Sequence, residues 1–265
     1  MATPKDSLNK TLIVALIMCV VFSIIVASAA VILKPMQDAN KVLDRNKNVL
    51  AAAGLLKDGM SAADINKQFS RFQTKLVDLS SGEYVTDAEM KNLGIASASS
   101  FDQKAAAASG DPILATKLDP AIDVALLKAQ SKYAPVYLLD DSAGNLETAV
   151  LPVRGYGLWS MMYGFMALKG DADTIRGFGF YSHGETPGLG GEVDNPSWKA
   201  LWPGVKLFDD NHKLAIDVTS KKQGPHVIDG LSGATLTTRG VDHLVRYWMG
   251  QYGFGPYLAN LQAGR

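Results

Sequence analysis

The chain has 265 residues, of which 47 % are hydrophobic and 20 % are charged, a composition that suits one membrane segment plus a folded part with one or two cores. Nothing in this composition is typical of a disordered chain. Lysine plus arginine and aspartate plus glutamate both number 26, so the excess of positive charge that binds nucleic acid is absent and we expect no nucleic-acid partner.

The first predicted element is a helix that crosses the lipid bilayer. The 23 residues from Thr11 to Leu33 carry no charge, whereas a helix needs roughly 20 residues to span a membrane. A cleaved signal peptide is the alternative, because 27–29 (Ala-Ser-Ala) resembles a cleavage site, but the apolar regions of signal peptides run to about 7 to 15 residues. We predict a retained anchor over residues 11–33, preceded by a short N-terminal segment, 1–10.

The basic residues around this segment do not predict an outward-facing C-terminal part. Two precede the span and four follow it: Lys5 and Lys10, then Lys34, Lys41, Arg45 and Lys47. Positive residues favour the cytoplasmic side, so this count opposes an exported C-terminal part, although long domains are translocated regardless of such counts. Cys19, the single cysteine, lies inside the span, and the chain alone therefore builds no disulfide and no cysteine-ligated zinc or iron–sulfur site.

Two helices are expected after the span. Pro35 is predicted to begin a stalk helix that Gly54 ends. Ser61 and Asp64 then predict the capped start of another helix, with an apolar stripe that is more typical of core than of a cofactor site. The stripe consists of Ile65, Phe69, Phe72, Leu76 and Leu79. Residues 95–118, rich in alanine and serine, are predicted to be an insertion or a surface segment, to which the sequence assigns no function.

A sheet is predicted to begin at residue 135. The expected strands are 135–139, 146–153, 161–168, 174–181 and 213–218. The connections are short, which favours antiparallel neighbours. The fold class is therefore α+β, with one N-terminal transmembrane helix and then a domain whose mainly antiparallel sheet is flanked by helices. We place the stalk and the N-terminal part of the extramembrane region at 34–134, and the domain itself at 135–265.

A glycine-rich turn precedes the next helix, at Asp229-Gly230-Leu231-Ser232-Gly233-Ala234-Thr235. Its glycines permit a tight, left-handed path, and its hydroxyls suit a helix N-cap. Apolar residues at 241, 244, 245 and 248 predict that the helix begins within a few residues of Thr235. The start of a helix favours a phosphate, whether free or covalently held, but the residue types alone favour an ordinary capped turn.

A second glycine-rich stretch runs from His183 to Gly191, after a predicted strand. Its glycines let backbone amides approach a planar ring or a phosphate. Val193 stands where a dinucleotide-binding loop has its third glycine, so NADH is not expected here. His183 and Glu185 lack a third ligand at useful spacing, which favours a hydrogen-bonded pair over a metal site.

The two stretches, His183-Gly184-Glu185-Thr186-Pro187-Gly188-Leu189-Gly190 and residues 229–235, resemble the flavin-binding loop and the flavinylation motif of one bacterial family. With the N-terminal segment, they make the chain similar over nearly its whole length to the NqrC family, the C subunits of sodium-translocating NADH:quinone oxidoreductases. The G subunit of the Rnf electron-transport complex shares both motifs and is the close alternative.

This resemblance implies a covalent FMN, joined by a phosphoester to Thr235 and transferred from FAD by a separate Mg-dependent flavin transferase. Asp229 and Gly230 would be recognised by that transferase, although Asp229 also suits a turn. The expected flavin contacts are Trp159, His183, Glu185, Thr186, Gly188, Leu189, Gly190, Leu231, Ser232, Gly233 and Ala234. Thr186 and Leu189 are the preferred ring contacts, whereas Trp159, on residue type alone, is more typical of the core.

The resemblance also implies an electron carrier of the bacterial inner membrane, single-pass, with a periplasmic C-terminal domain. It would pass electrons among the other subunits of an NADH:quinone oxidoreductase coupled to sodium export, with no catalytic residue and no metal of its own. A membrane-anchored periplasmic flavin-binding module without a redox role is the alternative from another class. A hydrolase is disfavoured, because residues 230–234 only approach G-x-S-x-G and His243 lies on the following helix.

Overall fold

The computed structural model describes residues 8–264 and comprises two compact units, Met1–Arg45 and Asn46–Arg265. Helix α1 (Leu8–Ala52) contains all described residues of the first unit and ends in the second. Among the described helices, α1 alone is long and apolar enough to cross a membrane. The prediction that Pro35 begins a separate helix was wrong, because α1 continues through Pro35. A proline removes one backbone hydrogen bond, and the residues on both sides of Pro35 continue the helix despite this loss.

The end of α1 belongs to the second unit and agrees with the sequence. The helix stops at Ala52, and Gly54 follows in a left-handed conformation with φ of 69°, as expected for a helix C-terminus. Ser61 and Asp64 form the predicted capping box of α2 (Ala62–Phe69). The apolar stripe after them is only partly helical, since Leu76 lies in β1 (Gln73–Asp78) and Phe72 and Leu79 flank that strand.

The second unit is built on a five-stranded antiparallel sheet in the order β1-β4-β5-β6-β7. Strands β4 to β7 are Tyr133–Asp140, Leu146–Tyr156, Met161–Lys169 and Ile175–Ser182, which confirms the four consecutive strands predicted from the sequence. Strand β1 pairs with β4, so residues before and after the predicted boundary at 134/135 share one sheet and one compact unit.

The predicted strand at 213–218 was wrong in extent and in place. Only Asp217–Val218 forms a strand (β8), which pairs in parallel with β9 (Val227–Ile228) outside the main sheet, and Leu214 makes only an isolated bridge to Phe208. The residues before β8 are used elsewhere, because Ala215 and Ile216 donate their backbone N–H groups to the carbonyl of Leu207.

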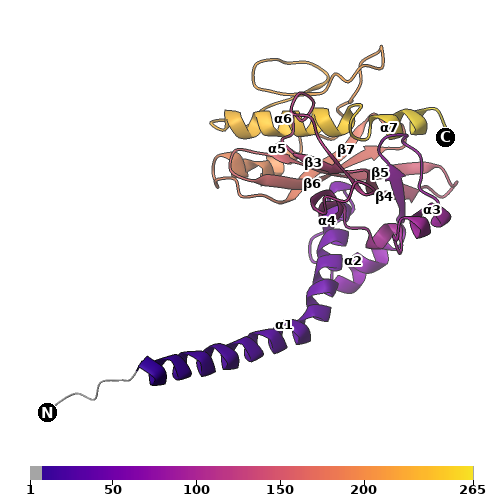
Figure 1. Ribbon diagram of the computed structural model, residues 1–265. Coiled ribbons are helices and arrows are strands. Elements are labelled where there is room, and N and C mark those ends of the chain that lie inside the picture. Colours follow the sequence, from indigo (N-terminus) through magenta and orange to yellow (C-terminus); the bar gives the residue numbers. More distant parts are fainter. Residues whose placement is uncertain (1–7, 265) are drawn as a thin grey trace. The chain divides into compact units, whose positions relative to one another are not determined.

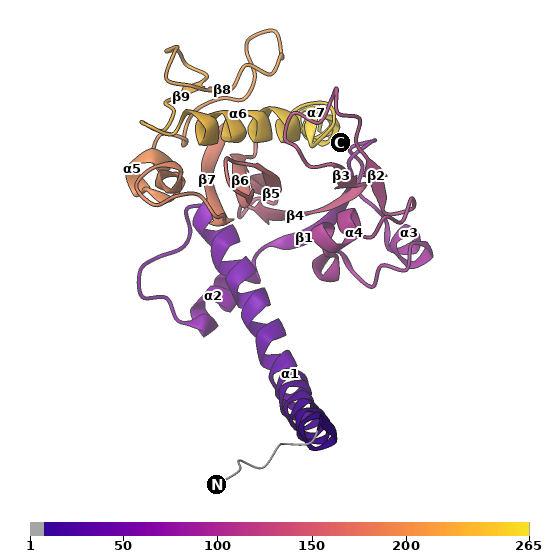
Figure 2. The same cartoon turned by 60° about the vertical axis from the view of Figure 1, so that its left-hand side comes forward.

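Helices cover both faces of the sheet (Figure 1 and Figure 2). Helix α6 (Thr235–Met249) lies along one face, with α7 (Gly255–Gln262) after it. Its buried face contains the predicted positions 241, 244, 245 and 248. Gly155 of β5 permits this contact, because a Cβ there would lie 2.8 Å from the Cβ of Leu244. On the opposite face, a chain of aromatic contacts joins Phe69 of α2 to Tyr137 and Phe165.

Short elements complete the unit: α3 (Asp87–Asn92), η1 (Ala98–Ser100), α4 (Gln103–Ala108), β2 (Ala115–Lys117), β3 (Ala129–Ser131), η2 (Gly190–Asp194) and α5 (Pro196–Lys199). The segment 95–118, rich in alanine and serine, contains η1, α4 and β2. Ala106 and Ala107 are buried, so α4 is part of the packed structure rather than a plain surface segment.

Candidate functional site

The first turn of α6 lies at the end of the glycine-rich turn 229–235. Gly233 is left-handed, with φ of 74°, as its residue type allows. The helix begins at Thr235, and the N-cap position is taken by Ala234, without any side-chain cap. The expectation that Ser232 or Thr235 caps the helix was therefore wrong. The backbone N–H groups of the first turn lack a side-chain cap and carry the positive end of the helix dipole.

Four hydroxyl side chains surround this helix start, and burial separates them into two pairs. Thr237 and Thr238 are buried, whereas Ser232 and Thr235 are exposed. The Oγ1 atom of Thr238 accepts a 2.9 Å hydrogen bond from the backbone N–H of Leu231, which closes the turn onto the helix. Thr237 is engaged by a carboxylate from a distant loop. The two exposed hydroxyls are the ones available for chemistry.

That carboxylate belongs to Glu185, whose residue is only 5 % exposed. Its Oε2 atom accepts a 2.6 Å hydrogen bond from Oγ1 of Thr237, and its Oε1 atom accepts backbone N–H groups of Leu158 at 3.1 Å and Trp159 at 3.0 Å. Burial alone would raise the pKa of Glu185, but these hydrogen bonds outweigh it and hold the pKa below its usual value. Glu185 is thus a buried anion.

Two glycines make room for this carboxylate. A Cβ at Gly157 would lie 2.5 Å from Oε1 of Glu185, and a Cβ at Gly190 would lie 2.4 Å from Oγ1 of Thr237. Gly190 therefore has a packing role inside the protein as well as its place in the motif. Gly188 differs, because it is exposed, left-handed with φ of 75°, and has open space around it.

The His183 ring is hydrogen-bonded to Asp194 and to the backbone of Glu185, and not to the Glu185 carboxylate. Its Nε2 atom lies 2.8 Å from Oδ2 of Asp194, and its Nδ1 atom accepts the backbone N–H of Glu185 at 3.2 Å. The expected His183–Glu185 pair exists only through that backbone group. Burial would raise the pKa of Asp194, but hydrogen bonds from His183 and Lys199 lower it. Within residues 8–264, no group of three or more metal-binding side chains occurs.

Exposed apolar side chains gather around the start of α6. Trp159 is 65 % exposed, Leu189 48 % and Leu236 52 %, and Tyr156 and Leu158 are exposed beside them. Leu189 lies over the turn, because a Cβ at Gly233 would be 3.6 Å from its Cδ2 atom. Trp159 is therefore a surface residue, whereas its residue type alone favoured a place in the core.

These residues fit a flavin phosphate ester. An exposed hydroxyl at an uncapped helix N-terminus suits a phosphate, and exposed aromatic and aliphatic side chains suit the faces of a planar ring. Thr186 is exposed and contributes its backbone carbonyl to the loop, accepting the N–H groups of Leu189 and Gly191. Asp229 is also exposed, and its backbone carbonyl accepts a 2.9 Å hydrogen bond from the indole of Trp198.

Several residues of this site were not predicted from the sequence. Thr237 and Leu158 hold Glu185, and Leu236 adds to the exposed apolar surface. The only feature of the sequence that points to these residues is that they lie next to the two predicted motifs or to Trp159.

The serine-hydrolase alternative is not supported by the structure. His243 lines a separate cavity of about 720 Å³ with Asp217 and Arg246, and Ser232 does not line that cavity. The strand before the turn is the two-residue β9, which matches the weak strand pattern of its sequence.

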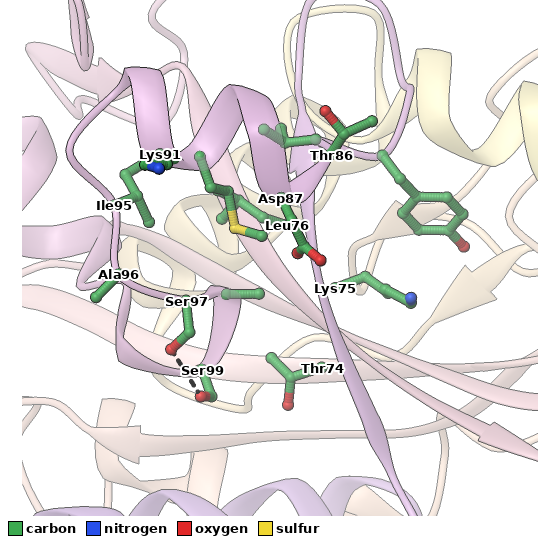
Figure 3. Close-up of a pocket in the computed structure, with 14 residues that line it drawn as sticks. Thr74, Lys75, Leu76, Thr86, Asp87, Lys91, Ile95, Ala96, Ser97 and Ser99 are labelled. Carbon is green, nitrogen blue, oxygen red and sulfur yellow. Dashed lines mark hydrogen bonds between the residues drawn. The ribbon is translucent and has the colours of Figure 1, made fainter.

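A larger groove of about 860 Å³ lies elsewhere in the second unit, between β1 and the segments around α3 and η1 (Figure 3). Thr74 and Lys75 line one side of it, and Ser97 and Ser99 line the other, with their hydroxyls 3.1 Å apart. None of the predicted flavin contacts lines this groove.

Residues 157–250 match the family of FMN-binding domains, a range that includes Trp159, both glycine-rich stretches and α6. The chain is 49 % identical over 267 residues to the C subunit of the Na(+)-translocating NADH-quinone reductase of Pseudomonas aeruginosa, covering 98 % of each chain. The chain belongs to this family, NqrC. It is also 44 % identical over 261 residues to the corresponding C subunit of Haemophilus ducreyi, covering 98 % of this chain and 96 % of that one.

Solved structures agree with membership of the NqrC family. The crystal structure of Shewanella oneidensis NqrC superposes with a TM-score of 0.71 at 34 % identity, covering 84 % of this chain and 99 % of that one. The C subunit from Parabacteroides distasonis shares the fold, with a TM-score of 0.64 at 23 % identity over 85 % of this chain and 96 % of that one. Full-length identity to NqrC chains favours this family over the Rnf alternative.

Proposed function

We propose that this chain is an electron-carrying subunit of a sodium-translocating NADH:quinone reductase and holds FMN as a phosphoester on Thr235. One observation carries the attachment site: Thr235 is exposed at the uncapped start of α6, while Thr237 and Thr238 are buried and hydrogen-bonded. Membership of the NqrC family and the match of residues 157–250 to FMN-binding domains support the cofactor.

The residues of the chain bind and orient the flavin. The backbone N–H groups of the first turn of α6 favour the phosphate, because they carry the positive end of the helix dipole. The exposed apolar side chains of Trp159 and Leu189 would lie against the ring. The FMN itself supplies the acceptance and release of electrons, so the chain needs no catalytic side chain of its own.

Maturation would form one bond and break another. The Oγ1–P bond of Thr235 forms, the pyrophosphate bond of FAD breaks, AMP leaves, and the hydroxyl proton passes to solvent. Asp229 suits recognition by a flavin transferase, because its side chain is exposed while the Trp198 indole fixes its backbone carbonyl.

The membrane topology of the proposal rests on α1. The uncharged part of this helix anchors the chain in the inner membrane, with residues 1–10 in the cytoplasm and the flavin domain in the periplasm, as the family resemblance implies. Covalent attachment would keep the carrier from being lost to the periplasm. The partners are the other subunits of the complex.

The test is co-expression of the full chain with a flavin transferase, followed by a denaturing gel and peptide mass spectrometry. We expect a fluorescent band, and a peptide containing Thr235 that is heavier by FMN less one water. Thr235→Ala should abolish the band, while Ser232→Ala, a change at the other exposed hydroxyl, should keep it. A colourless wild-type chain would overturn the proposal in favour of a membrane-anchored binding module without covalent flavin, and flavin on Ser232 would overturn the attachment site.

A further inference from the structure

Three segments of the flavin site meet at one buried carboxylate. The turn after β5 supplies the backbone N–H groups of Leu158 and Trp159, the loop after β7 supplies Glu185, and the first turn of α6 supplies Thr237. Each segment also carries an exposed apolar residue of the site: Trp159, Leu189 and Leu236, respectively. The exposed residues are therefore held by a contact beneath them.

The surroundings of the Glu185 carboxylate let it join these three segments. Its oxygens accept hydrogen bonds from the other two segments, and the missing side chains of Gly157 and Gly190 let these segments approach. A second hydrogen bond, 2.6 Å from the backbone N–H of Gly184 to Oγ of Ser160, joins the same loop to the same turn.

Simple core packing does not account for a glutamate at this place. Burying a charge costs more than burying an apolar side chain of similar volume, unless hydrogen bonds compensate it. An apolar residue would fill the space but would fix neither the backbone of Trp159 nor the hydroxyl of Thr237. The anion adds directional contacts that hold orientation.

We infer that Glu185 is the positioning residue of the flavin site. It acts through the backbone of Trp159 and the hydroxyl of Thr237, and so sets the place of the indole ring relative to Oγ1 of Thr235. This inference rests on the proposed function and changes the expected role of Glu185, which holds the walls of the site rather than touching the ring.

The first arm of the test needs no flavin. In a Thr235→Ala background, hydrogen–deuterium exchange is followed in peptides that contain Leu158 and Trp159, with and without Glu185→Ala. Loss of a hydrogen bond to a charged group should speed exchange of these amides about tenfold or more. Glu192→Ala is the matched control, because Glu192 lies in η2, directly after this loop, and its carboxylate accepts a hydrogen bond from Asn195 instead. Unchanged exchange in Glu185→Ala would overturn the inference.

The second arm uses the flavinylated full chain and the fluorescence of its flavin, which a stacked indole quenches. Glu185→Ala and Thr237→Val should raise the fluorescence yield and the accessibility to iodide, and Thr237→Ser should restore both to wild-type values. Glu185→Gln should stay near wild type, because the Thr237 hydroxyl can turn to accept from the new amide.

The outcomes separate the two proposals. A wild-type chain without covalent flavin would remove the proposed function, yet the exchange experiment would still decide whether Glu185 holds the turn. A flavinylated Thr237→Val chain with wild-type fluorescence and iodide quenching would overturn the positioning role and leave the proposed function intact. Because Thr237→Val leaves the carboxylate in place, this variant tests the positioning role even if Glu185→Ala does not fold.

Discussion

The Oγ1 atom of Thr237 donates a 2.6 Å hydrogen bond to Oε2 of Glu185, which lies 52 positions earlier in the chain. This contact joins the first glycine-rich stretch to the helix turn that directly follows the second. It places a buried anion beneath the exposed surface that surrounds Thr235. The stability of the site should therefore depend on these buried residues rather than on Thr235, the proposed attachment residue.

The first prediction contrasts two threonines of one helix turn. Thr237→Val should lower the free energy of unfolding by about 1.5 to 3 kcal/mol, since it removes a hydrogen bond to a charged, buried acceptor. Thr235→Val changes an exposed side chain and should stay within about 0.5 kcal/mol of wild type. Thermal unfolding of the full chain in detergent, without flavin, measures both. Equal losses in the two variants would contradict this assignment.

Gly190→Ala should disturb the same contact from the other side. The added Cβ would lie 2.4 Å from Oγ1 of Thr237 and 2.8 Å from Oε2 of Glu185, so the hydrogen bond between them must open. Overpacking of this kind costs about 1 to 3 kcal/mol. Covalent flavin per chain and the melting temperature should both fall. Glu192→Ala, on the same loop, should change neither, and a Gly190→Ala chain with wild-type values would show that the loop relaxes freely.

A pH effect follows from the lowered pKa of Glu185. In the unfolded chain a glutamate titrates near pH 4.3, so the ionised carboxylate stabilises the fold fully above about that pH. This contribution is lost as the pH falls through the lower pKa of the folded state. Wild type should therefore be more stable than Glu185→Gln at pH 7, and the difference should shrink below about pH 4.3. Melting temperatures of both chains measured across this range test the sign, and a constant difference would contradict it.

Arg176 should hold the last turn of α1 on the edge of the sheet. Its Nε atom donates to the carbonyl of Ala53 at 2.9 Å, and one of its terminal nitrogens donates to Glu147 at 2.8 Å and Thr148 at 2.7 Å. Arg176→Met keeps the stem but removes these donors, and we expect a loss of about 1.5 to 3 kcal/mol with faster amide exchange near Ala53. Arg71→Met, at an exposed arginine, serves as the control and should leave both quantities unchanged.

Membrane attachment should depend on the first unit. The full chain should stay in the membrane fraction after alkaline extraction, whereas a chain lacking residues 1–45 should leave it with its sheet intact by circular dichroism. The cleaved alternative makes a different prediction. N-terminal sequencing of the mature protein that begins near residue 30 would show a removed signal peptide rather than an anchor.

The sequence by itself determined the local elements of this protein. An uncharged run of 23 residues marked the apolar helix, Ser61 and Asp64 marked a capping box, and short connections marked the antiparallel strands. The helix start at Thr235 was also correct. Each of these features follows from residues close together in the chain, so it can be predicted without knowledge of the fold.

Only the tertiary structure decided which residues serve the site and how. It assigned β1 to the sheet edge, continued α1 through Pro35, and left Ala234 rather than a hydroxyl at the cap of α6. It also brought Glu185 to Thr237 and Trp159. Local preferences allow several outcomes at these positions, and the packing of residues far apart in the chain selects one of them, because burial makes an unmatched polar group or strand edge costly.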